Sequence, residues 1–327
     1  MAPSDRWTKF WPQWTEKRRP DFPSQETMTA NTKLQAAALA LAASAILSLI
    51  DTFVASVAEE AGLWQFQIFR TLFALPLLLL LGRALRVSVR PKHWGRLALR
   101  SAAVSAGLLF YFASLGTMPV AQAGAGLFSA PIWVLLLSAM VFGARIGGLH
   151  VLAVLGGFGG ALLVLRPDAA ALSVMTVLPL AAGALYGFGM LLTREICAQE
   201  SPVALALGVF ATIGLFSLGM VCVTTLAPGE TFLTRPWAPV TFRFLWLTLF
   251  QAAGAVIAVT LIAQAYRIGR PAQVAVYEYS FLVFAAFWGL ALWGIATDAT
   301  SWIGIAVILV SGLIVARLPD MRPDARS

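Results

Sequence analysis

The chain has 327 residues, of which 59% are apolar and only 12% are charged, whereas soluble domains carry about 25% charged residues. The charged residues lie between long apolar runs, a pattern that excludes an ordinary soluble domain and is typical of a membrane protein with many helical spans. The net charge of +8 does not indicate nucleic-acid binding, because the basic residues lie in short loops and at the chain ends.

Residues 1–33 differ from the rest of the chain. They contain three tryptophans, four prolines and the basic run Lys17–Arg19, and they lack the apolar core of a secretory signal. We expect a disordered cytoplasmic tail. Two alternatives remain: translation that begins at Met28, and an anchor in which the Trp and Arg side chains lie at the membrane interface.

Ten apolar segments of about 20 residues follow, each long enough to cross a hydrocarbon layer of about 30 Å as a helix. Strands of a membrane barrel are excluded, because such strands alternate polar and apolar residues and these segments are apolar throughout. The predicted spans are 34–58, 63–82, 96–116, 119–142, 146–165, 174–195, 203–227, 243–266, 271–294 and 300–318.

Loop charge predicts the orientation of the spans. With the N-terminus in the cytoplasm, all but four of the 23 Lys and Arg residues fall on the cytoplasmic side. The exceptions are Arg70, inside a span, and Arg166, Arg235 and Arg243. Because cytoplasmic loops of membrane proteins are enriched in Lys and Arg, this distribution predicts that both termini are cytoplasmic.

The two halves of the chain resemble each other. Several residues of the first half recur 151 or 152 positions later: Ala121–Gln122 as Ala272–Gln273, Ser129 as Ser280, Gly160 as Gly312 and Pro167 as Pro319. Each copy holds five spans, and an odd number means that the second copy enters the membrane from the opposite side. Such inverted repeats are typical of secondary transporters, which bind substrate near the midplane between the repeats.

Ordered motifs give a family resemblance over residues 34–319. They are Phe69–Pro76, Tyr111–Pro119, Phe128–Pro131, Gly156–Gly160 and Leu165–Pro167 in the first half, and Ala265–Arg267, Tyr277–Tyr279, Trp302–Gly304 and Ser311–Gly312 in the second. In this order they resemble the EamA family of the drug/metabolite transporter superfamily. The resemblance implies two inverted five-helix EamA repeats, 34–167 and 174–319, with a cytoplasmic tail at 320–327. Asp51, Phe69–Arg70 and Glu278–Tyr279 are similar to the branch that contains S-adenosylmethionine and riboflavin transporters.

Three ionisable residues lie well inside spans: Asp51, Arg70 and Glu278. A charged side chain at the centre of a lipid-exposed helix costs about 2.5–3.5 kcal/mol on insertion scales, which makes each a candidate for function. Asp51 and Arg70 lie at equal depth on neighbouring antiparallel spans, roughly 10 Å below the outer interface. They are therefore expected to pair, either as a neutral structural pair or with Arg70 holding an anionic group of the substrate.

Glu278 is the first candidate for contact with substrate, as a proton carrier or as a counter-ion for a cation. The alternative is a protonated Glu278 that hydrogen-bonds a neighbouring helix. Tyr277 and Tyr279 flank it in the sequence. Because adjacent helical residues point about 100° apart, we expect at most one of these tyrosines to face the same cavity wall as Glu278. Further candidates for an aromatic and amide-lined wall are Tyr111, Gln122, Phe128, Trp133, Tyr186, Gln251, Gln264 and Gln273.

The sequence therefore predicts an all-α secondary transporter of the inner membrane that moves a small organic metabolite by alternating access. An amino acid, a vitamin or a nucleoside-like compound fits, and coupling by protons or by exchange is expected. A membrane-embedded enzyme and a passive channel are the alternatives. We expect no cofactor, no nucleic-acid partner, and a monomer or homodimer in the lipid bilayer. Cys197 and Cys222 are too few and too dispersed to indicate a metal site or disulfide scaffold. Substrate, direction and coupling ion are not encoded in any recognisable motif.

Overall fold

A computed structural model describes residues 30–130, 133–134, 136–137, 140, 148–165, 174–268, 274 and 277–317. Every regular element in these residues is a helix, so the all-α prediction is confirmed for them. The helices are α1 (Ala30–Thr52), α2 (Val54–Glu60), α3 (Leu63–Ala84), α4 (Trp94–Leu115), α5 (Val120–Leu127), α7 (Gly148–Leu165), α8 (Val174–Ile196), α9 (Pro202–Leu226), α10 (Phe242–Ile268), α12 (Ser280–Trp293) and α13 (Ala299–Arg317).

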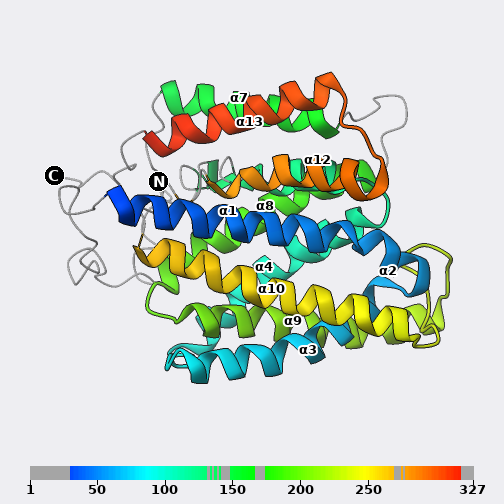
Figure 1. The fold of residues 1–327 in the computed structure, drawn as a ribbon. Coiled ribbons are helices and arrows are strands. Elements are labelled where there is room, and N and C mark those ends of the chain that lie inside the picture. The colour runs from blue at the N-terminus through cyan, green and yellow to red at the C-terminus, as the bar shows by residue number, and fades with distance from the viewer. Residues whose placement is uncertain are drawn as a thin grey trace, which may run out of the picture.

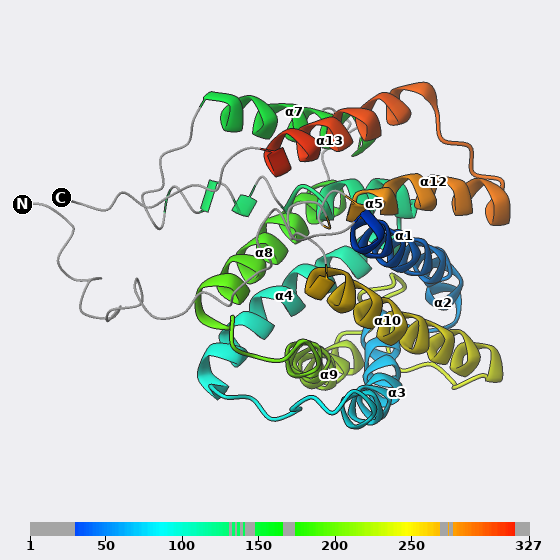
Figure 2. The ribbon, with the colours of Figure 1, turned by 60° about the vertical axis from the view of Figure 1, so that its left-hand side comes forward.

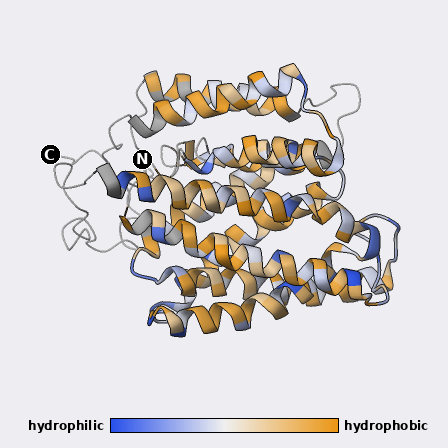
Figure 3. Ribbon diagram, viewed as in Figure 1, coloured by the Kyte–Doolittle hydropathy of each residue, from blue (hydrophilic) through white to orange (hydrophobic). Residues whose placement is uncertain are grey.

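The helices have the length and composition of membrane spans. Among the described residues, five are long and apolar enough to cross a bilayer: Lys33–Glu60, Leu63–Ala84, Trp94–Leu115, Pro202–Leu226 and Phe242–Ile262. Shorter apolar helices cover Leu155–Val164, Val177–Thr193, Ser280–Trp293 and Ala299–Ile314. Figure 3 shows hydrophobic residues along the helix bodies and hydrophilic residues mainly towards the helix ends and connections. Large apolar side chains such as Leu72, 60% exposed, and Leu215, 73% exposed, are suited to lipid contact.

The helices pack as a bundle between two peripheral pairs. Helix α7 packs on α13 at one side, and α3 packs on α9 at the opposite side, as both views of the ribbon show (Figures 1 and 2). Between them, α4 packs on α8, and α1 packs on α10 and α12, while α5 lies against α8 and α12. The beginning of α1 and the end of α13 lie at the same end of the bundle (Figure 1).

Glycines allow the closest helix contacts. A Cβ atom on Gly160 of α7 would lie 2.7 Å from the Gly304 carbonyl oxygen, and a Cβ on Gly304 of α13 would lie 2.7 Å from that of Gly160. Small residues let helix backbones approach in this way inside membranes, where no hydrophobic force draws helices together. The glycine-rich segment 156–160 thus contributes to helix packing.

Replacing Gly160 by Leu is expected to separate α7 from α13 and to lower the melting temperature in detergent. Overpacking of this kind typically costs about 1–3 kcal/mol. Gly159→Leu is the matched control, because a Cβ on Gly159 meets no atom within 4 Å. A thermal melt followed by size-exclusion chromatography measures both. Equal melting temperatures for the two variants would contradict the packing role of Gly160.

Three helices are interrupted where the sequence predicts continuous spans. The Phe53 amide donates to the Ile50 carbonyl at 3.1 Å, the Ser129 amide to Gly126 at 3.1 Å, and the Leu282 amide to Tyr279 at 3.1 Å. Each bond reaches three residues back, as in a 3₁₀ turn, in place of the four of an α-helix. The predicted span 34–58 thus corresponds to the candidate span Lys33–Glu60, with a turn inside it. The turns at Ser129 and Tyr279 lie in the described parts of the predicted spans 119–142 and 271–294.

A distant side chain explains the first interruption. The Gln251 Nε2 on α10 donates to the Ile50 carbonyl, and the Thr52 hydroxyl donates to the Leu49 carbonyl at 2.5 Å. At the Ile50 carbonyl Gln251 donates in addition to the Phe53 amide, and at the Leu49 carbonyl the Thr52 hydroxyl takes the place of that amide. Neither carbonyl is therefore left unpaired inside lipid. Helix α1 thus ends just after Asp51 and α2 begins at Val54.

The loop 227–241 forms hydrogen bonds with α2 and α3 at one end of the bundle. The Gln65 side chain forms two hydrogen bonds with the Ala238 backbone, at 2.9 and 2.8 Å. Arg235 donates to the carbonyls of Ala58 and Glu59, at 2.8 and 2.9 Å. The last turn of α2 and the first turn of α3 are therefore held in place by a segment far along the chain.

Candidate functional site

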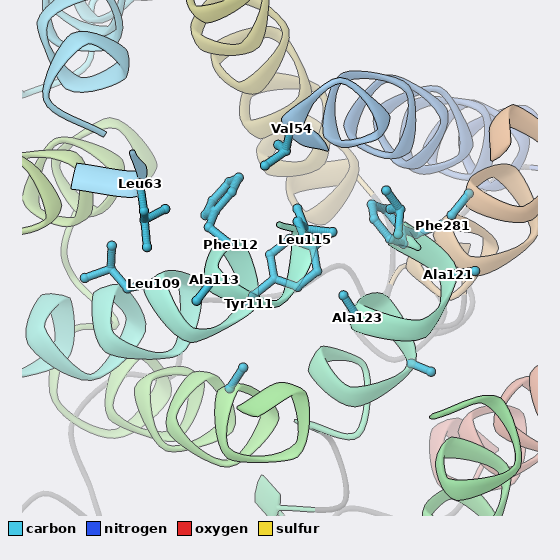
Figure 4. Close-up of a cluster of buried hydrophobic side chains, with 14 of the residues drawn as sticks. Val54, Leu63, Leu109, Tyr111, Phe112, Ala113, Leu115, Ala121, Ala123 and Phe281 are labelled. Carbon is cyan, nitrogen blue, oxygen red and sulfur yellow. The ribbon is translucent and has the colours of Figure 1, made fainter. Parts of the chain in front are cut away.

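Asp51, Tyr111 and Arg70 meet inside the bundle. The Tyr111 hydroxyl donates to Asp51 Oδ2 at 2.8 Å. The Arg70 guanidinium carbon lies 4.5 Å from the ring centre of Phe112 and 5.2 Å from that of Phe210. Asp51, Tyr111 and Arg70 are 6%, 2% and 5% exposed. Figure 4 shows Tyr111 and Phe112 together on α4, among the apolar side chains that fill this part of the molecule.

The predicted association of Asp51 with Arg70 takes an indirect form. The two groups are close enough to influence each other electrostatically. In the described part of the chain, however, the Asp51 carboxylate hydrogen-bonds Tyr111, and no ion pair joins it to Arg70. A hydrogen bond to a charged group is worth about 1.5–3 kcal/mol, and a cation above an aromatic ring gains about 2 kcal/mol when desolvated. Tyr111, Phe112 and Phe210 therefore help to hold the two charges inside the bundle.

Buried amides and hydroxyls surround this pair of charges. Both amide atoms of Gln67, the hydroxyl of Thr248, Gln251 Oε1 and Arg70 Nε are buried without a hydrogen-bond partner in the described structure. Gln67 precedes Arg70 by one turn of α3, while Thr248 lies between Phe244, which contacts Phe69, and Gln251, which contacts Ile50. Burying an amide without a partner costs at least about 1–3 kcal/mol. The interior here is suited to polar molecules.

Glu278 lies about two turns further towards the start of α1 than Asp51. The Ser44 hydroxyl of α1 donates to the Glu278 carbonyl at 3.4 Å. Tyr186 of α8 is within electrostatic range of the Glu278 carboxyl. Gly107 of α4 lies directly against the Tyr186 backbone, and Tyr111 follows one turn further along α4. The candidate site therefore extends from Arg70 through Tyr111 and Tyr186 to Glu278.

The tyrosines beside Glu278 point to different surroundings, in agreement with the helical geometry. Tyr279 is buried, and its ring centre lies 5.9 Å from that of Phe128. Phe128 also lies 5.1 Å from the ring of Phe281. Tyr277 packs instead beside a separate small cluster that includes Ala36 and Val274. Tyr279 thus contributes to an aromatic group at the α5–α12 contact, and Tyr277 does not.

The remaining predicted residues have different outcomes, and Gln264 on α10 is exposed. The half-buried Trp133 donates from Nε1 to the Ser129 hydroxyl at 3.2 Å, and Gln122 is half-buried on α5. Gln273 lies outside the described residues. Gln67 and Thr248 escaped the sequence prediction, although a Gln three residues before Arg70 inside an apolar span was a usable signal.

Arg100 lies inside the predicted span 96–116. It belongs to α4 and is 7% exposed, so it is not a residue of the exposed basic loop that starts at Arg83. Its side chain donates to the Thr193 hydroxyl at 2.8 Å and to the Leu205 carbonyl at 3.0 Å. Arg100 therefore joins α4 to α8 and α9 inside the bundle, where a guanidinium can satisfy several acceptors.

Comparison with known proteins shows a similarity to a family of transporters. Residues 34–166 match the EamA-like transporter family. A riboflavin transporter of Rhizobium johnstonii is 27% identical over 270 residues, which cover 82% of this chain and 83% of that protein. The chain is therefore similar to the EamA-like transporter family over its first half. It is also 23% identical to a pseudopaline exporter of Pseudomonas aeruginosa over 280 residues, which cover 85% of the chain and 95% of the exporter.

The fold of this chain is also found in a solved crystal structure. The two share 18% identity with a TM-score of 0.62, over 86% of this chain and 96% of the other. The apolar helices and the similarity to the EamA-like transporter family indicate a multi-pass membrane protein, and the bacterial relatives indicate the inner membrane. Family and relatives point to the transport of small metabolites, and to a transporter in preference to an enzyme.

Proposed function

We propose that the chain is a secondary carrier that moves a small organic metabolite across the inner membrane by alternating access. Proton coupling or exchange would drive it. The observation that supports this most directly is the group of buried polar residues that extends from Arg70 to Glu278 between apolar helices. Ionisable side chains inside membrane bundles usually mark a path for substrates or ions.

The helix contacts support two inverted repeats, residues 34–167 and 174–319. In this arrangement each helix of the first half has a counterpart in the second: α1 with α8, α3 with α9, α4 with α10, α5 with α12 and α7 with α13. If every helix is replaced by its counterpart, each observed contact becomes another observed contact. The α4–α8 contact becomes α10–α1, α5–α8 becomes α12–α1, and α4–α9 becomes α10–α3. The contacts α3–α9, α5–α12 and α7–α13 map onto themselves. A bundle whose helix contacts are exchanged in this way fits a pseudo-twofold axis, as in transporters built from inverted repeats.

The interruptions of two helices support the same correspondence. The turns Gly126–Ser129 and Tyr279–Leu282 lie 153 residues apart, close to the offset of 151 at which Ser129 and Ser280 recur in the sequence. The rings of Phe128 and Tyr279 contact each other across the proposed repeat interface. Discontinuous helices at such an interface are where secondary transporters bind substrates.

The surroundings of Glu278 favour a planar metabolite that carries polar groups. Tyr186 and Tyr279 lie within electrostatic range of the Glu278 carboxyl, and the Tyr279 ring contacts that of Phe128, which in turn contacts Phe281. Aromatic rings gain from stacking in addition to their burial. Because relatives are named riboflavin transporters, riboflavin is the first compound to test, with Glu278 as the group that binds it or carries a proton.

Flux into proteoliposomes tests the proposal. Labelled riboflavin is offered first, and then labelled amino acids and nucleosides, with and without a pH gradient. We expect uptake of at least one compound to saturate with concentration and to respond to its own gradient or the proton gradient. Uptake that rises linearly with concentration would indicate a channel, and no flux above empty vesicles for the whole set would contradict the carrier.

A further inference from the structure

A small pocket of about 260 Å³ lies at the end of α3, far from Asp51 and Glu278. It is lined by Leu79, Gly82, Arg83, Arg86, Val87 and Val89. In Figure 1 this end of α3 and the following connection lie at the end of the bundle where α1 begins. The pocket thus combines two guanidinium-bearing residues with an apolar wall at the end of a membrane helix.

Arg86 occupies a backbone conformation that favours glycine. Its φ is 53°, and it is the non-glycine residue with positive φ in the described structure. Arg86 donates its amide to the Arg83 carbonyl at 3.2 Å, and Val87 donates to the Gly82 carbonyl at 3.0 Å. This pair of bonds is a Schellman motif, in which the left-handed position is usually glycine because a Cβ atom is strained there. An arginine at this point costs the helix end stability and leaves its charge beside the pocket.

The neighbouring surface is apolar and open to lipid. Leu79 is 43% exposed, Leu80 59% and Leu85 50%. A free polar metabolite gains nothing from such a wall, whereas an acyl chain does. Arginine suits phosphate because its planar donors can bind two oxygens at once. Basic pockets beside membrane helices on the cytoplasmic side are well placed to bind anionic lipid headgroups.

We propose that this pocket binds the phosphate headgroup of an anionic phospholipid, with Arg83 and Arg86 as its ligands and Leu79 against the acyl chain. The lipid would hold the connection between α3 and α4 at the membrane surface. The proposal depends on membrane insertion and is independent of the substrate and of transport. The two guanidinium groups can also bind free phosphate, so the test must distinguish lipid binding from phosphate binding.

Lipid binding by the purified full-length protein tests the proposal. The delipidated protein in neutral detergent is titrated with phosphatidylglycerol or phosphatidylcholine, and native mass spectrometry and the melting temperature are recorded. We expect phosphatidylglycerol to bind and stabilise the protein, and phosphatidylcholine and inorganic phosphate to have little effect. Arg86→Gly should weaken phosphatidylglycerol binding at least about tenfold, the loss of one charge-assisted hydrogen bond.

The stability of Arg86→Gly without lipid separates binding from folding. Because glycine relieves the strain at φ 53°, the variant should melt no lower than the wild type when lipid is absent. Arg83→Gln should also weaken binding, whereas Arg90→Gln removes a charge from the same connection without touching the pocket lining and should bind normally. Equal binding of both lipids, unchanged binding by Arg86→Gly, or equal stabilisation by inorganic phosphate would overturn the proposal.

Discussion

Arg70→Met is expected to destabilise the protein by about 3–5 kcal/mol, because it leaves the buried Asp51 carboxylate without its nearby cation. The methionine preserves the packing against Phe112 and Phe210 and removes only the charge and its donors. If the two groups act mainly as a structural pair, Asp51→Asn combined with Arg70→Met should recover most of the lost stability. Melting temperatures in detergent give the comparison.

Transport separates the structural role of Arg70 from a role in binding substrate. Should the double variant regain stability but remain inactive, Arg70 contacts substrate in addition to neutralising Asp51. Tyr111→Phe is a useful companion, because it removes the 2.8 Å hydrogen bond to Asp51 and leaves the ring. A double variant that is no more stable than Arg70→Met would contradict the coupling of the two charges.

Glu278→Gln is expected to fold, to insert and to lose at least about tenfold in transport rate. The amide keeps the size of the side chain and can still hydrogen-bond, but it can neither take up a proton nor pair with a cation. A loss of one charge-assisted interaction, about 1.5–3 kcal/mol, corresponds to roughly ten- to 100-fold in rate. Initial rates of uptake, measured across a range of pH, should also lose their pH dependence.

Glu230→Gln is the control for this substitution. Glu230 is exposed in the loop between α9 and α10, so its change to an amide should leave transport as it is in the wild type. A Glu278→Gln protein that transports at the wild-type rate at every pH would exclude Glu278 both as a proton carrier and as a counter-ion.

The sequence predicts helix positions well because apolar length alone determines them. The span predicted over 203–227 is α9, Pro202–Leu226, and the one over 243–266 is α10, Phe242–Ile268. Interruptions within the helices are not predicted in this way. At the one after Asp51, the Ile50 carbonyl accepts a hydrogen bond from Gln251, which is 201 residues away in the chain, and no local sequence pattern predicts that contact.

The sequence predicts how deep in the membrane the site residues lie, but not how the helices that carry them are rotated about their axes. Equal distances from the membrane surface indicated that Asp51 and Arg70 would be near each other. The choice of Tyr111 as the hydrogen-bond partner of Asp51 depends on how α1, α3 and α4 are turned about their own axes, which side-chain spacing on one helix cannot determine. The separation of Tyr277 from Tyr279 was predictable, because it follows from the geometry of a single helix.

Counterflow is the most direct test of the carrier. Proteoliposomes are loaded with a high concentration of unlabelled riboflavin and diluted into a trace of labelled riboflavin, and the experiment is repeated with the amino acids and nucleosides. A carrier that alternates between two faces returns loaded with outside label, so we expect a transient accumulation of label above its equilibrium level for at least one compound. Label that only rises to equilibrium, for every compound that crosses the membrane, would contradict alternating access.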